Sequence, residues 1–97
     1  MDINCPNHIV YPDQDPDCYF LFMMKTSDPE VYRMASPENL IGGAHKACQL
    51  MVTDTGADPV IDVGMKFWHD NPNISQRGAT LFVAHAATAY CPQVVRH

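Results

Sequence analysis

The 97-residue chain carries six basic and eleven acidic side chains, and its formal net charge at neutral pH is −5. The few basic residues are scattered, which argues against a nucleic-acid partner and against an anionic membrane surface. No apolar run approaches the ~18 residues of a membrane span. The length predicts one small domain, in which covalent constraints help to stabilise a limited core.

Residues 1–14 are rich in Pro, Asn and Asp and are expected to be irregular. We expect a helical domain over 15–92 and a C-terminal tail over 93–97. The opening "MDINCPNH" has neither a basic region nor an apolar segment, so an exported form would need a signal peptide that is not in this sequence.

Helix starts are marked by a capping side chain followed by proline, whose missing N–H costs nothing at the first helical position. Four pairs have this pattern: Asp15-Pro16, Asp28-Pro29, Ser36-Pro37 and Asp58-Pro59. Residues 73–76 offer a fifth start, with Ser75 as an alternative cap.

The first helix is predicted over 16–26, with a short helical turn at 29–34. Its core, "YFLFMM", is apolar all round, and a buried strand would fit that run nearly as well. The Asp-Pro-Asp start favours a helix. Such a helix is either central and covered on every side, which we favour, or it presents an apolar groove or a dimer face.

The second long helix is predicted over 37–52, with one apolar stripe. Gly42 and Gly43 within it each cost about 1 kcal/mol relative to alanine. The glycines either permit close approach of another helix or mark a kink, and the sequence leaves both open.

Two more helices are predicted over 59–70 and 74–91. On the first, Asp62 and Lys66 form an i,i+4 pair opposite an apolar face that includes Trp68. The last helix ends near Cys91 because Pro92 cannot continue it comfortably.

The four cysteines are more consistent with disulfides than with zinc, because no pair has the two-residue spacing typical of zinc sites. Short connections make consecutive helices antiparallel, which brings Cys48 and Cys91 to the same end of the bundle. A bridge there would close a loop of about 44 residues and stabilise the fold by on the order of 4 kcal/mol. Cys5 and Cys18 then remain to form a second bridge, unless Cys18 stays free as a reactive thiol near a helix start.

The segments "FLFM", "LIGGAHKACQLM" and "ATLFVAHAATAYCP", in this order, resemble the domain of unknown function 732 family of small secreted mycobacterial proteins. The resemblance covers roughly residues 18–92. It implies export, an all-helical fold and a cysteine pair matching Cys48 and Cys91, and it implies no activity. Cys5 and Cys18 depart from the family pattern.

Five histidines raise the question of a metal or haem site: His8, His45, His69, His85 and His97. A haem site needs an axial ligand in an apolar pocket. The residues considered for such a ligand-facing pocket are His85, Tyr90, Phe82, Trp68 and Met23. The alternative that these are simply core residues is favoured, and neither a metal nor a cofactor is expected.

The sequence does not define a biochemical task. Ser27, Ser36 and Ser75 are better explained as turn or cap residues than as nucleophiles, so we do not expect an enzyme. We expect an all-α bundle of about four helices with two disulfides, located outside the cell or in the cell envelope. It would be a non-catalytic binding or interaction module for an unknown protein or an apolar small molecule, with a weak homodimer as a further candidate. The alternatives are a haem or metal carrier that uses helix histidines and, after it, a small hydrolase.

Overall fold

A computed structural model describes residue 5 and residues 10–95 of the chain. His8 and His97 lie outside the described residues, as do most of the N-terminal segment 1–9 and the last two residues of the tail. The described part contains α-helices, turns and one 3₁₀ helix, and no strand is present in it. The predicted all-α fold is therefore confirmed.

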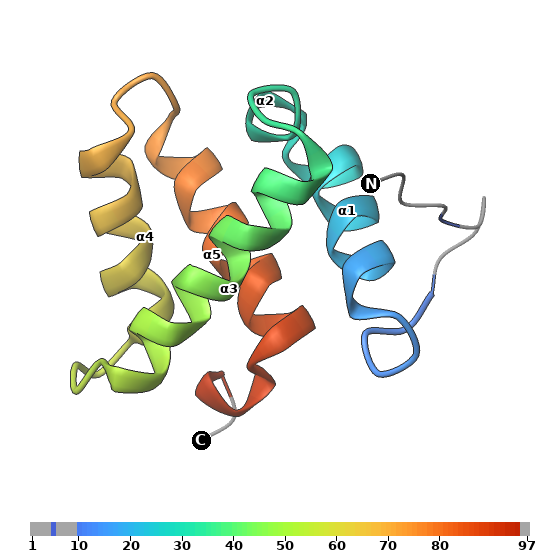
Figure 1. Cartoon of the computed structure of the whole chain (residues 1–97). Helices are drawn as coiled ribbons and strands as arrows, with labels where there is room; N and C mark the ends of the chain where they lie inside the picture. Colours follow the sequence, from blue (N-terminus) through green and yellow to red (C-terminus); the bar gives the residue numbers. More distant parts are fainter. Residues whose placement is uncertain (1–4, 6–9, 96–97) are drawn as a thin grey trace.

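The helices follow one another with short connections (Figure 1). In chain order they are α1 (Pro16–Ser27), α2 (Pro29–Tyr32), α3 (Pro37–Thr53), α4 (Pro59–Asp70), α5 (Gln76–Tyr90) and the 3₁₀ helix η1 (Pro92–Val94). None of these described helices is long and apolar enough to cross a membrane.

Local capping explains where three of the long helices begin. The Asp15 carboxylate accepts from the Cys18 N–H at 3.1 Å, and the Ser36 hydroxyl accepts from the N–H of Asn39 at 3.2 Å. Asp58 caps α4 in the same way. Each cap is followed by proline, so these starts agree with the sequence pattern.

The last helix starts later than residue 74, at Gln76. Ser75, the alternative cap, accepts from the N–H of Gly78 at 2.9 Å. Its own N–H and hydroxyl donate to the Glu30 carboxylate at 2.8 and 2.9 Å. Glu30 on α2 thus holds the start of α5, an interaction across 45 residues of sequence that no local pattern could reveal.

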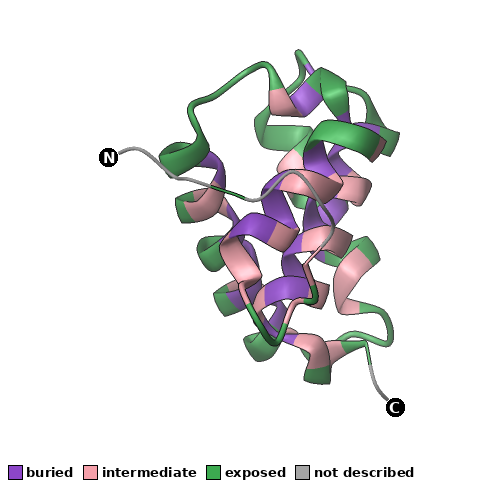
Figure 2. Cartoon of the chain, turned by 90° about the vertical axis from the view of Figure 1, so that its right-hand side faces the viewer, coloured by how far each residue is buried: buried purple, intermediate pink, exposed green. Residues whose placement is uncertain are grey.

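Helix α5 is the centre of the bundle and packs against α1, α2, α3 and α4. In Figure 1, α3 passes across α5, and both run from the top to the bottom of the view, whereas α4 runs from the bottom to the top. The expectation that the first helix is central was wrong, because α1 flanks the bundle on one side. Buried positions lie on the inward faces of the helices (Figure 2), and the largest fully buried side chains are Phe20, Met24, Met51 and Val83.

Both predicted disulfides are formed, and all four cysteines are paired. The Cα atoms are 5.5 Å apart in Cys5–Cys18 and 5.9 Å apart in Cys48–Cys91. Cys18 is therefore not a free thiol. Disulfides persist in oxidising compartments, so the paired cysteines indicate an extracellular or otherwise oxidising environment.

The glycine pair in α3 permits close approach at one position only. Gly42 faces open space, whereas a Cβ at Gly43 would lie 3.3 Å from Cζ of Phe82 on α5. Helix α3 continues through both glycines from Pro37 to Thr53. Gly43 therefore supports the close-approach interpretation.

Candidate apolar binding cleft

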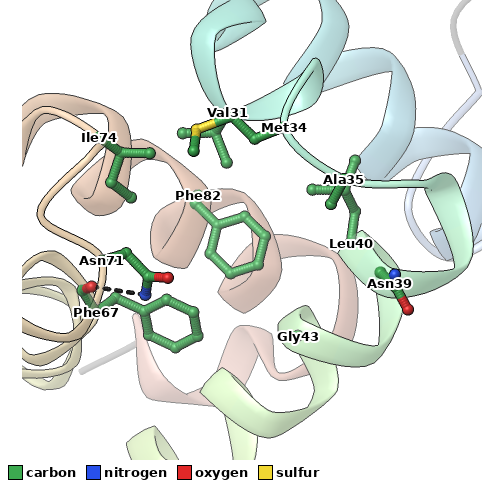
Figure 3. A pocket seen from close by; sticks show the side chains of 10 residues that line it. All are labelled: Val31, Met34, Ala35, Asn39, Leu40, Gly43, Phe67, Asn71, Ile74 and Phe82. Atoms are coloured by element: carbon green, nitrogen blue, oxygen red, sulfur yellow. Dashed lines mark hydrogen bonds between the residues drawn. The ribbon is translucent and has the colours of Figure 1, made fainter.

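A half-open apolar cleft of about 260 Å³ lies where α2, α3, α4 and α5 meet. Figure 3 shows the Phe82 ring at the centre of the side chains that surround it. The lining residues are Val31, Met34, Ala35, Asn39, Leu40, Gly43, Phe67, Asn71, Ile74 and Phe82. Most of these side chains are hydrocarbon, so the cleft is suited to an apolar group.

The aromatic floor of the cleft is held by ring contacts. The centroid of the Phe82 ring lies 5.7 Å from that of Phe20 in an edge-to-face arrangement and 5.2 Å from that of Phe67. Such pairs contribute about 0.5–1.5 kcal/mol beyond their buried area. Phe82 is thus positioned from α1 and α4 together, while Gly43 leaves room for its edge.

Two amide side chains stand at the edge of the cleft. Asn71 follows the last residue of α4, and its Nδ2 donates to the carbonyl oxygen of Phe67 at 2.9 Å, which holds the amide in place (Figure 3). Asn39 is exposed in the first turn of α3. An amide both donates and accepts hydrogen bonds, so either group is able to bind a polar atom of a ligand.

A second hollow of about 330 Å³ adjoins the cleft between α3 and α4. Both hollows are lined by Gly43, Phe67 and Asn71. The side chains that distinguish the second one are Lys46, Leu50, Lys66 and Asp70. The apolar cleft therefore adjoins a hollow that is lined by two lysines.

The predicted pair Asp62–Lys66 was wrong, since no salt bridge joins these two described residues. Asp62 instead interacts with the carboxyl group of Asp54 in the loop before α4, which raises the pKa of Asp62. Lys66 lines the second hollow.

The family model described as "Protein of unknown function (DUF732)" matches residues 12–93. The chain belongs to this family. No curated protein and no solved structure matches it. The membership confirms the resemblance seen in the sequence and assigns no activity to the DUF732 fold.

The DUF732 chain does not bring the five ligand-facing candidates together. Phe82 alone of these candidates lines the cleft. Tyr90 lies beside a different hollow next to Cys48–Cys91, and its hydroxyl donates to Asp17 at 2.5 Å. Trp68 is 38% exposed on α4, and Met23 is half-buried on α1.

His85, the haem-ligand candidate, is half-buried in α5 and does not line the cleft. Its Nε2 is buried, with no hydrogen-bond partner among the described residues. Burial lowers the pKa of His85, which favours the neutral ring. Within the described part of the DUF732 chain, no group of three or more His, Cys, Asp or Glu side chains is arranged to hold a metal ion.

Several residues of the cleft were not identified from the sequence. Asn39, Asn71 and Ile74 belong to a helix start, a helix end and a loop, and each of those positions has an ordinary local explanation. Leu40 is a buried residue of α3, but an apolar stripe in the sequence does not distinguish a core position from a cleft wall. The cleft exists because four elements meet around Phe82.

Proposed function

We propose that this DUF732 domain is a non-catalytic binding module that holds a small apolar molecule in the cleft around Phe82. The observation that carries the proposal is the cleft itself, a concave space with apolar walls drawn from four helices and two amides at its edge. Small-molecule sites commonly combine apolar walls with a few well-placed polar groups.

Binding is favoured over catalysis by the chemistry of the lining. Its polar side chains are those of Asn39 and Asn71. A carboxamide is neither a nucleophile nor a general base near neutral pH, and catalysis needs such groups in contact with the substrate. The cleft therefore has the means to retain a ligand and to orient a polar atom on it.

We further propose that the protein is exported and acts outside the cell or in the cell envelope. The two disulfides support this, because such bonds are rare in reducing compartments and common in small secreted domains. Mass spectrometry of the protein isolated from culture medium and from cell lysate without reduction tests this proposal. Recovery solely as the reduced protein inside cells would contradict it.

The binding proposal is tested by an NMR titration of the isotopically labelled, disulfide-bonded protein with 1-octanol, a neutral apolar probe. We expect saturable shift changes at Phe82, Asn71 and Leu40. The variant Asn39→Phe places a ring at the mouth of the cleft and should abolish binding. The matched variant Gln49→Phe lies on another exposed part of α3 and should leave it intact. Shift changes scattered over the surface, or none, would overturn the proposal.

A second candidate function, association with a protein or with a second copy of the chain, is favoured by the outer face of α4. Ile61, Met65 and Trp68 follow the i, i+4, i+7 spacing of one helix face and are 53%, 39% and 38% exposed. Sedimentation velocity over a range of concentrations tests for a homodimer. If the face is a dimer contact, Ile61→Lys with Met65→Lys should give a monomer at all concentrations.

A haem carrier receives less support. The cleft is lined by no described histidine, and His85 lies away from it. The buried Nε2 of His85 is the one feature in its favour. A haem titration tests it: a shifted Soret band that is lost in His85→Gln would favour the carrier over the apolar-ligand proposal.

A further inference from the structure

We propose that the ligand is a single-chain amphipathic anion, a fatty carboxylate whose alkyl chain lies over Phe82 and whose carboxylate lies between Lys46 and Lys66. This inference rests on the proposed binding function and deepens it by naming the chemical class of the ligand.

The first argument is that the two hollows adjoin each other. The apolar cleft and the adjoining hollow share three lining residues, Gly43, Phe67 and Asn71. Gly43 adds no side chain at this boundary, and Phe67 on α4 lines both hollows. In the proposed complex, the alkyl chain extends from Phe82 across this shared boundary into the hollow between α3 and α4.

The second argument is charge complementarity. Lys46 on α3 and Lys66 on α4 are two of only six basic residues in a chain of net charge −5, and both line the same hollow. Neither lysine forms a salt bridge with any residue that the structure describes. Asp70 also lines this hollow, so its local formal charge is positive. A carboxylate there would be attracted from both walls of the groove.

The third argument is size. The cleft, at about 260 Å³, lies just below the usual range of small-molecule pockets, roughly 300–1,000 Å³. A narrow apolar space beside a hollow with two cations fits one flexible chain with a charged end better than a bulky ring system or a two-chain lipid.

The test is a set of NMR titrations of the disulfide-bonded protein with hexanoate, octanoate, decanoate and 1-octanol. We expect the affinity of the carboxylates to rise roughly fourfold for each methylene group that becomes buried. Octanoate should bind more tightly than octanol, which has the same chain length and no charge. Shift changes should appear both around Phe82 and at the backbone amides of Lys46 and Lys66.

The double variant Lys46→Gln with Lys66→Gln distinguishes the contribution of the carboxylate to binding from that of the alkyl chain. It should weaken octanoate binding roughly two- to thirtyfold, as the loss of two exposed ion pairs implies, and leave octanol binding unchanged. Lys25→Gln removes an exposed lysine from the end of α1 and is the matched control, with no effect expected on either probe.

The outcomes distinguish this inference from the function on which it rests. Equal affinities for octanol and octanoate, unaffected by the double variant, would overturn the fatty carboxylate and leave the apolar cleft standing. Octanoate binding that depends on the lysines but does not shift the Phe82 region would show surface ion binding and would also overturn it. If neither probe shifts the cleft residues, the proposed function fails as well.

Discussion

Gly43 on α3 lies so close to Phe82 on α5 that a methyl group at residue 43 would stand 3.3 Å from Cζ of the ring. The neighbouring Gly42 has nothing within 4 Å of the same position. Two adjacent glycines in one helix therefore have different tertiary surroundings, and they form a matched pair for substitution.

Gly42→Ala should stabilise the protein by up to about 1 kcal/mol, because alanine has the higher helix propensity and meets open space. Gly43→Ala should gain clearly less, because the Phe82 ring must move and is held by Phe20 and Phe67. Urea unfolding of both variants measures the difference. Equal gains would mean that the ring yields without cost.

The Cys48–Cys91 bridge should be the more important of the two disulfides. Its residues are 43 apart in sequence, compared with 13 for Cys5–Cys18, and the chain-entropy model gives about 4 and 3 kcal/mol respectively. Both Cys48 and Cys91 are also buried in the core, whereas Cys5 is exposed.

The double serine variants of each pair, compared by guanidinium unfolding, test this order. Cys48→Ser with Cys91→Ser should lose the larger free energy of unfolding. A greater loss from Cys5→Ser with Cys18→Ser would contradict it and would mean that the N-terminal bridge holds more of the fold.

Tyr90 connects the end of α5 to the start of α1 through the 2.5 Å hydrogen bond from its hydroxyl to Asp17. Tyr90→Phe should lower the free energy of unfolding by about 1–3 kcal/mol, since a charged acceptor loses its donor in a half-buried place. Tyr11→Phe, at an exposed hydroxyl, is the control and should be neutral. No loss in Tyr90→Phe would show that water replaces the hydroxyl at Asp17.

The same contact makes a spectroscopic prediction. Burial, together with the bond to Asp17, raises the pKa of Tyr90. In an alkaline absorbance titration of the folded protein, Tyr90 should ionise at a higher pH than a free tyrosine. An ordinary tyrosine titration that disappears in Tyr90→Phe would contradict this.

Asp28 should make the free energy of unfolding decrease as the pH rises, whereas most carboxylates in folded proteins make it increase. It is 3% exposed between α1 and α2, and burial, assisted by the charge of Glu30, raises its pKa from 3.8 to about 6. The backbone N–H of Val31 and the charge of Arg77 offset part of this increase.

Between about pH 4 and pH 6, Asp28 is therefore protonated in the folded state and ionised in the unfolded chain. The stabilisation is complete below the unfolded pKa and is lost as the pH rises through about 6, by at most about 3 kcal/mol. His85, whose pKa is lowered, has the opposite slope below its ordinary value of 6.5.

Comparing the wild type with Asp28→Asn isolates this effect, because His85 is present in both proteins. The difference in free energy of unfolding, Asp28→Asn minus wild type, should increase from pH 4 to pH 7. Asp13→Asn, in an exposed turn, should show no such trend. A difference that stays constant with pH would show that Asp28 does not change its proton occupancy on folding.

The helix starts were predictable because their causes lie within three residues of sequence. Asp15, Ser36 and Asp58 each cap an amide three positions ahead, and the following proline makes the pattern legible. Short connections make consecutive helices antiparallel, and this predicted that Cys48 and Cys91 lie at the same end of the bundle. The sequence left two positions open for the start of α5. The cap at Ser75 is held by Glu30 from α2, a contact that the local sequence does not reveal.

The position of the candidate site was not predictable in this way. "YFLFMM" is the most apolar run of the chain, yet α1 flanks the bundle, and the alanine-rich α5 occupies the centre because small residues let four helices approach it together. Trp68 belongs to the predicted apolar face of α4, yet it is 38% exposed, whereas Val63 on the same helix is buried.

Hydrophobic periodicity and capping are local, so the amino-acid order was enough to predict the helices and their approximate ends. Whether Cys18 pairs with Cys5 stayed open in the sequence, and the structure shows that bridge. The cleft around Phe82 depends on how far α3 and α4 stand apart while both pack on α5, and on the space that Gly43 leaves between them. Those distances are set by side chains remote in sequence. Only their packing in three dimensions brings Asn39 and Asn71 to the cleft, and Lys46 and Lys66 to the hollow beside it.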